Sequence, residues 1–262
     1  MFEFVRYHGK RRVKGAGLMT LGLGLMTALY IYMFPTITAA VDLDEYMQAF
    51  PPALREAFGT EALGTIEGFL AAELYAFGWV ILLGLYMAYA AASLVADDIE
   101  HGRMDMTLSL PVSRSRVLLE KFGSMLVPML VINAAMPVIV FAGVVSIGES
   151  ISVADLVMVH LLSIPYLLTA AAIGLVTSVV FDRAGIAQRA AMGVVFGLFL
   201  IDSVTAGTDF SWLGAIAPQR YYDPGAVLVH SEWDLGGAVL LLAASAVLVL
   251  ASREYFRRKD IA

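Results

Sequence analysis

Residues 97–114, DDIEHGRMDMTLSLPVSR, form a charged stretch between two apolar runs that are each long enough to cross a bilayer. Glu100 supplies a carboxylate, and Gly102 interrupts the helical pattern. A short amphipathic turn follows and ends at Pro111 and Arg114. The pattern predicts a compact, rigid segment on one side of the membrane. We interpret it as a docking element, through which a soluble partner could move the membrane part.

The composition of the 262 residues excludes a domain that is globular in water. Hydrophobic residues make up 60% and charged residues 15% of the chain, against roughly 25% charged in soluble domains, and the mean hydropathy is +0.79. A membrane span needs about 20 mostly apolar residues, and the chain has six such runs. We therefore predict an all-α integral membrane protein with six transmembrane helices and no separate soluble domain. The predicted spans are residues 17–39, 70–96, 119–145, 153–180, 186–206 and 236–252, within a membrane domain of residues 17–253.

The basic residues lie mostly on one side of this predicted bundle. Fifteen of the 17 lysines and arginines lie in four places. Those places are the arm 1–16, the segment 97–118 together with Lys121, the loop between spans 4 and 5 together with Arg189, and the tail 254–262 together with Arg253. Because cytoplasmic segments carry the excess of basic residues, both termini and the docking segment are predicted to be cytoplasmic. The chain has no cysteine, so disulfides and thiolate metal sites are excluded.

Two spans carry rows of small residues at four-residue spacing. Thr20, Gly24 and Ala28 form the row in span 1, and Gly193 and Gly197 form a GxxxG row in span 5. Such rows let helix backbones approach closely. They predict packing seams, either within one chain or between two chains.

The predicted outer loop, residues 207–235, is much longer than a simple connection between adjacent helices. Apolar stretches at 213–217 and 225–229 predict short helices that tuck toward the membrane. Arg220 is expected to pair with Asp223 or another outer acid. We interpret the loop as an outer gate, with a rigid cap as the alternative. The gate residues are Trp212, Pro218, Arg220, Tyr221, Tyr222 and Asp223.

No catalytic motif is present. The chain has no GxxxxGK[ST] phosphate loop, no HExxH and no GxSxG. One alternative is a membrane enzyme whose polar residues assemble only in three dimensions, from Glu73, Asn133, His160 and Asp202. Another is an assembly or immunity factor that transports nothing.

The docking segment resembles that of the permease subunit of prokaryotic ABC-2 type ABC transporters. The family pattern is E-x-G-T…L-x-x-P-x-S-R…K, and Arg103 departs from it because threonine usually follows the glycine. The matching residues are Glu100, Gly102, Leu108, Leu110, Pro111, Arg114 and Lys121.

The resemblance implies a type V exporter-like fold in the plasma membrane, surrounded by lipids, with no nucleic-acid partner. Two copies would pair mainly through spans 1 and 5. Two separate ATP-binding subunits would grip the docking segment and would bind the ATP and Mg that this chain does not hold. The resemblance leaves the substrate open among peptides, lipids, drugs and copper- or sulfur-related cargo. The implied docking residues are Glu100, Gly102, Arg103, Asp105, Leu108, Pro111 and Arg114.

Overall fold

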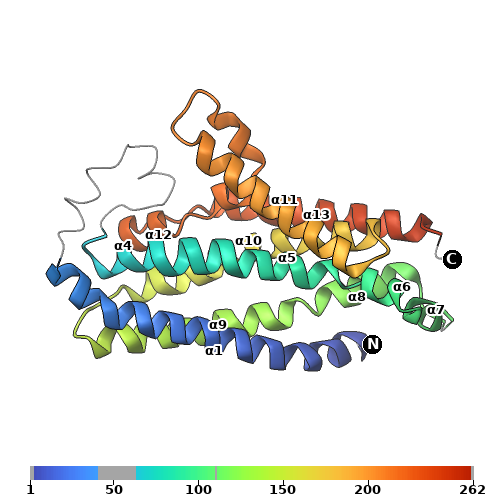
Figure 1. The fold of residues 1–262 in the computed structure, drawn as a ribbon, viewed down its shortest axis with the longest axis horizontal. Coiled ribbons are helices and arrows are strands. Elements are labelled where there is room, and N and C mark those ends of the chain that lie inside the picture. The colour runs from blue at the N-terminus through green and yellow to red at the C-terminus, as the bar shows by residue number, and fades with distance from the viewer. Residues whose placement is uncertain (1–2, 41–62, 110, 261–262) are drawn as a thin grey trace.

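The computed structural model describes residues 3–40, 63–109 and 111–260, and every regular element in that part of the chain is helical (Figure 1). Six of its helical segments are long and apolar enough to cross a membrane. This confirms the predicted six-span, all-α architecture. The observed spans are Val13–Ala40, Ile66–Glu100, Arg114–Ser146, Val153–Val180, Ala184–Thr205 and Leu235–Arg258.

Several spans consist of consecutive helices. Span 1 is α1 (Glu3–Ala40), and span 2 runs through α4 (Ile66–Leu70), η1 (Ala71–Leu83), α5 (Gly84–Ala92) and α6 (Ala96–Glu100). Span 3 consists of α8 (Arg114–Gly123) and α9 (Leu126–Ser146), and spans 4, 5 and 6 are α10 (Val153–Val180), α11 (Ala184–Thr205) and α13 (Leu235–Arg258). The connections hold α7 (Arg103–Leu108), η2 (Ser211–Ile216), η3 (Pro218–Tyr221) and α12 (Pro224–His230).

Spans 2 and 3 are longer than their apolar runs. Span 2 continues to Glu100 and span 3 begins at Arg114. The helices extend through charged residues because those residues pair with one another, as Arg116 does with Glu120 one turn later at 2.7 Å. Much of the segment predicted as a separate docking element is therefore the end of two spans.

Span 4 forms the centre of the bundle. α10 packs against both α5 and α13, while α1 packs mainly against α9. Figure 1 shows α1 and α9 along one edge, α11 and α13 along the opposite edge, and α5 and α10 between them. Gly174 of α10 makes the close α5–α10 contact possible, because a side chain there would collide with the backbone carbonyl of Ala88.

The two ends of the bundle carry different elements (Figure 1). The start of α1 and the end of α13 lie at the same end as α6, α7 and α8, which we call the terminal end. α4 and α12 lie at the other end, which we call the loop end. The docking segment and the long loop are thus separated by the length of the bundle.

The first half of span 2 is wound as a π-helix over Ala71–Leu83. At its end the Tyr166 hydroxyl donates a hydrogen bond to the carbonyl of Val80 at 2.7 Å, and Tyr166 fills the space beside Gly84. Inserted side chains and π-helical turns are common causes of helix distortion. Span 2 is therefore irregular in the half that lies toward the loop end.

Candidate functional site

The docking segment turns sharply at Gly102. This residue has a φ of 64°, in the left-handed region that glycine adopts without strain, and its N–H donates to the carbonyl of Ile99 at 3.0 Å. The turn ends α6 and starts α7. It explains why glycine stands at this position.

Glu100 is bound to another span. Its Oε2 accepts a hydrogen bond from the backbone N–H of Ala184 at 2.8 Å, and Ala184 is the first residue of α11. A carboxylate at a helix N-terminus satisfies a free donor and interacts favourably with the helix dipole. Glu100 therefore links the docking segment to span 5.

Asp98 is the centre of the ionic contacts at the terminal end, and the sequence analysis did not single it out. Arg103 Nε donates to Asp98 at 2.9 Å, and a second arginine nitrogen pairs with Asp97. The hydrogen bond to Asp98 raises the pKa of Arg103 above its usual range. Lys121 also pairs with Asp98 and donates to the carbonyl of Leu94 at 2.9 Å, with only 4% of its side chain exposed. Lys121 thus holds the ends of spans 2 and 3 together, and Arg103 ties α7 to the end of span 2.

Arg114 is held by the C-terminal part of the chain. Its guanidinium donates to the backbone carbonyl of Lys259. The Lys259 ammonium in turn donates to the carbonyl of Val179 at 2.7 Å and pairs with Asp182 at 2.6 Å. The start of α8 is therefore tied, through Lys259, to the connection between spans 4 and 5.

The predicted docking residues thus fall into two groups. Glu100, Arg103 and Arg114 make internal contacts, and Leu108 packs against the core. The rest of the segment is more exposed, including Met106 at 66%. We call this exposed surface the docking tip, which consists of His101, Gly102, Asp105, Met106, Ser109 and Pro111. His101, Met106 and Ser109 were not predicted, and Leu110 lies outside the described residues.

The two rows of small residues have different surroundings. Gly24 of α1 faces Ile139 of α9, with 3.5 Å between a Cβ placed on the glycine and the isoleucine side chain. Within the same row, Thr20 bonds to its own helix at the carbonyl of Ala16 and Ala28 is exposed. A Cβ placed on Gly193 or Gly197 of α11 would have no atom within 4 Å among the described residues, apart from the nearby backbone of its own helix. Span 1 therefore uses Gly24 for packing within the chain, whereas the α11 row is open.

The long loop is helical where its apolar stretches predicted helices. η2 and α12 cover these stretches, and η3 lies between them. Asp223 caps α12 by accepting from the N–H groups of Gly225 and Ala226 at 2.8 and 3.1 Å. Arg220 pairs with Asp202 of α11 at 3.8 Å instead of Asp223, and it also donates to the carbonyl of Ser211. The expectation was Asp223 or another outer acid, and the observed partner, Asp202, belongs to span 5.

One half of the loop is attached to α11. Besides the contact with Arg220, Asp202 accepts from Gln219 Nε2 at 3.4 Å, and the same nitrogen donates to the carbonyl of Leu198 at 3.1 Å. Pro218 is buried beside these residues, and Tyr221 donates to the carbonyl of Ala215 at 2.7 Å. η2 and η3 therefore form one unit with the part of span 5 that lies toward the loop.

The other half of the loop is attached to α10. Tyr222 is buried, stacks on Tyr166 with 5.7 Å between ring centroids, and donates to the carbonyl of Val159 at 3.1 Å. Burial raises the pKa of the Tyr222 hydroxyl well above its usual range, so the group stays protonated and can donate. Trp233 Nε1 and the Ser231 hydroxyl donate to the Asp155 carboxylate at 3.0 and 2.9 Å. The loop changes its attachment from α11 to α10 between Arg220 and Tyr222.

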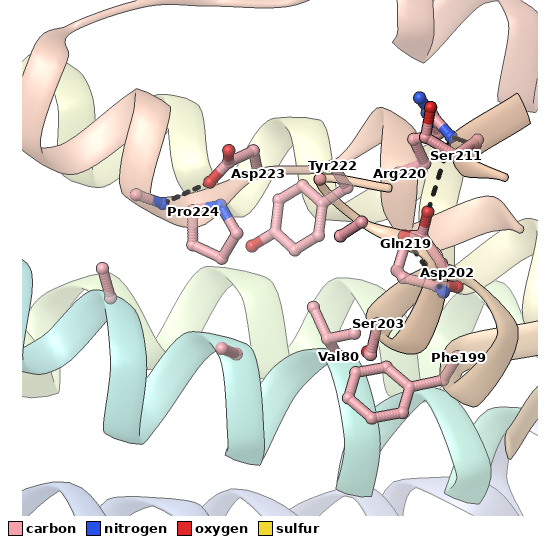
Figure 2. Close-up of a pocket in the computed structure, with 15 residues that line it drawn as sticks. Val80, Phe199, Asp202, Ser203, Ser211, Gln219, Arg220, Tyr222, Asp223 and Pro224 are labelled. Atoms are coloured by element: carbon pink, nitrogen blue, oxygen red, sulfur yellow. Dashed lines mark hydrogen bonds and ion pairs between the residues drawn. The ribbon is translucent and has the colours of Figure 1, made fainter. Parts of the chain in front are cut away.

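A cavity of about 440 Å³ lies between the half of the loop that is attached to α11 and the half that is attached to α10. η1 lines it with Val80, α11 with Phe199 and Asp202, and the loop with Arg220 and Tyr222. Figure 2 shows Asp202, Gln219 and Arg220 gathered together, with the apolar Val80 and Phe199 below them. Three of the six predicted gate residues, Arg220, Tyr222 and Asp223, therefore line the cavity. The other three, Trp212, Pro218 and Tyr221, are not part of the lining, and Trp212 is 67% exposed.

The residues proposed for an intramembrane enzyme are not brought into one site. Asn133 accepts from the Ser163 hydroxyl at 2.9 Å, and His160 contacts Tyr75 at 3.5 Å within the bundle. Glu73 is exposed, and Asp202 belongs to the cavity at the loop end. Asn133 makes an interhelical hydrogen bond, as expected for a polar side chain in a span.

Comparison with known proteins supports the arrangement of spans described above. A family model described as "ABC-2 family transporter protein" matches residues 14–215, which run from span 1 into η2. The chain is also 24% identical over 209 residues to "Uncharacterized protein YhcI" of Bacillus subtilis (strain 168), covering 70% of this chain and 66% of that protein. The chain therefore belongs to the ABC-2 transporter family, as a multi-pass membrane component.

Proposed function

We propose that the chain is the permease subunit of an ATP-driven ABC-2 exporter, works as a homodimer and pairs with two separate ATP-binding subunits. The protein lies in the plasma membrane. Its docking segment and both termini face the cytoplasm, in keeping with the distribution of basic residues. The ATP and Mg belong to the partner subunits. The loop end then faces outward and forms the exit for the substrate.

The observation that carries this proposal is the position of α11 between the docking segment and the cavity. Its first residue, Ala184, binds Glu100 next to the docking tip. Near its other end, Asp202 contacts Gln219 and Arg220 in the loop. The helix has 22 residues, which corresponds to about 33 Å. A displacement of the docking tip would therefore reach the gate through one rigid element.

The outer half of α11 is free to move relative to span 2. Its first half packs through small residues, Ala184, Ala187 and Ala191, against Ala88 and Ala92 of α5. Its second half borders the cavity. The open glycine row at Gly193 and Gly197 lies between these halves and offers a surface for a second copy.

Purification of the tagged full chain from its host tests the proposal directly. We expect an ATP-binding subunit to co-purify, and we expect Met106→Asp to reduce that association because Met106 is the most exposed apolar residue of the docking tip. A matched control is Leu235→Asp, since Leu235 is 60% exposed at the loop end. Normal association of the Met106 variant would remove the docking tip from the interface. If no ATPase accompanies the wild-type chain, the proposed complex is wrong.

A second variant separates docking from transmission. Glu100→Ala removes the carboxylate that accepts from the N–H of Ala184 but leaves the residues of the docking tip unchanged. We expect the ATPase to remain bound while ATP hydrolysis loses its dependence on transported substrate. Loss of binding in this variant would instead place Glu100 in the ATPase interface.

A further inference from the structure

The cavity at the loop end has one apolar wall, one pair of opposite charges and a second carboxylate, Asp223, whose Oδ1 is already engaged in capping α12. Ala76 and Val80 of η1 and Phe199 of α11 supply the apolar wall. Asp202 and Arg220 supply the charges. A volume of about 440 Å³ lies within the range of ligand sites, which runs from about 300 to 1,000 Å³.

The charge pair is weak enough to be displaced. Arg220 Nη1 and Asp202 Oδ1 are 3.8 Å apart, beyond the roughly 3.2 Å limit of a good hydrogen bond. The bond from Gln219 to the same carboxylate is also long, at 3.4 Å. With 39% of the arginine side chain and 20% of the aspartate side chain exposed, water screens the pair and it adds little to stability. A ligand that offers shorter, charge-assisted bonds can therefore compete for both groups.

The surroundings place these charges at the level of lipid head groups. Asp202 is near the end of span 5. Phe210 and Trp212, just beyond it, are 62% and 67% exposed, as aromatic residues at a membrane interface commonly are. A ligand with its polar group at this level and an apolar chain along η1 would match both walls of the cavity.

We infer that the cavity binds a zwitterionic amphiphile. Its ammonium group pairs with Asp202, its anionic group pairs with Arg220, and its apolar part lies against Val80 and Phe199. The ligand then replaces the contact of Arg220 that helps to hold η3 on α11, leaving the bond from Gln219 to the carbonyl of Leu198, so that occupancy of the cavity loosens the gate. That this ligand is transported rests on the proposed function. That it binds in the cavity does not.

Binding to the purified full chain in a nonionic detergent tests the inference. Three short-chain probes are compared by isothermal titration: dihexanoylphosphatidylethanolamine, dihexanoylphosphatidylglycerol and decyltrimethylammonium. They carry a zwitterionic, an anionic and a cationic head group. We expect the zwitterionic probe to bind about tenfold or more tightly than the anionic probe, as two charge-assisted contacts predict.

Two variants give opposite changes in preference. Asp202→Asn should remove the tight binding of the zwitterion and favour the anionic probe, because Arg220 loses its competitor. Arg220→Gln should also weaken zwitterion binding, but it should strengthen binding of the cationic probe at the freed Asp202. The controls are Asp209→Asn and Arg189→Gln, which alter exposed charges outside the cavity. Both controls should bind all three probes as the wild type does.

The inference would be overturned if the three probes bound with equal affinity. It would also be overturned if the Asp202→Asn variant had a normal gel-filtration profile and still preferred the zwitterionic probe. Mass spectrometry of amphiphiles that co-purify with the wild type but not with Asp202→Asn distinguishes a bilayer phospholipid from another cargo. Zwitterion binding without any ATPase-coupled transport would support the site and reject only the proposed function.

Discussion

At the terminal end of the bundle, buried and half-buried ionic contacts join helices that are far apart in the sequence. Lys121 lies against Asp98, Glu100 against α11, and Arg114 against the backbone near Lys259. At the loop end, Tyr222 stacks on Tyr166 and makes a neutral hydrogen bond, Gln219 makes a long one to Asp202, and Trp233 and Ser231 donate to the Asp155 carboxylate. The ion pair there, Arg220 with Asp202, is more exposed and longer than the pair of Lys121 with Asp98.

This difference matters because a buried charge that loses its partner is costly, whereas an exposed pair exchanges readily with water. The terminal end is therefore suited to move as a unit with whatever grips the docking tip. The loop end is suited to open. The following variants test that contrast, from the largest expected effect to the smallest.

Lys121→Met should cause the largest loss of stability. It leaves Asp98 with Arg103 as its remaining cationic partner and leaves the carbonyl of Leu94 without its lysine donor. Breaking a buried pair typically costs about 3–5 kcal/mol. Thermal unfolding of the purified chain, followed by circular dichroism, measures the effect. Arg257→Gln is the control because Arg257 forms an exposed pair with Glu254. If the two variants unfold alike, the terminal end is not held by its buried charges.

Glu100→Ala should have an intermediate effect. Removing a side-chain acceptor from a helix N-terminus typically costs about 0.5–2 kcal/mol, and here the acceptor also joins span 2 to span 5. We expect amide hydrogen exchange in the variant to become faster than in the wild type at the start of α11 but not in α10. Glu149→Ala, which changes an exposed acid near the loop end, is the comparison. Unchanged exchange at the start of α11 would mean that Glu100 contributes no restraint.

Tyr222→Phe should cost about 0.5–1.5 kcal/mol, the usual net contribution of a neutral hydrogen bond. The variant loses the bond to the carbonyl of Val159 but keeps the ring that stacks on Tyr166. Labelling of a cysteine placed at Val227, in a chain that has no native cysteine, reports opening of the loop. We expect faster labelling in the Tyr222 variant, with Tyr255→Phe as an exposed control. Equal labelling rates would favour a loop held by packing alone.

Arg220→Gln should have the smallest effect on stability, about 0–1 kcal/mol, because its pair with Asp202 is partly exposed. Thermal unfolding should therefore be close to that of the wild type, even though ligand preference changes. A loss comparable to that of Lys121→Met would show that the two ends are equally rigid. The contrast between them would then be wrong.

Several features of the fold could be predicted because they depend on local composition. The six spans follow from uninterrupted apolar runs, which the structure confirms with small shifts of boundary. Gly102 could be identified as a turn because glycine interrupts a helical pattern, and its positive φ agrees with that reading. The short helices in the loop between spans 5 and 6 also followed from apolar stretches bounded by prolines.

The partners of the polar residues could not be predicted in the same way. Glu100 was read as a contact for another protein, yet its carboxylate binds Ala184, which is 84 positions away in the sequence. Arg220 was expected to pair with Asp223 or another outer acid, and the sequence did not identify Asp202 of span 5 as that partner. The four-residue spacing of Gly24 and Gly193 is the same, although one packs on α9 and the other is open.

The sequence by itself determined the membrane location, the number of spans and the uneven distribution of charge between the two sides. These properties depend on the free energy of transferring each segment from water to lipid. That free energy is a sum over the residues of the segment and does not depend on the other segments. Only the tertiary structure decided which charges are internal, which surface of the docking segment is exposed and where the cavity lies. These features depend on how tilted helices pack, because a small rotation of a helix changes which of its side chains meets a distant partner.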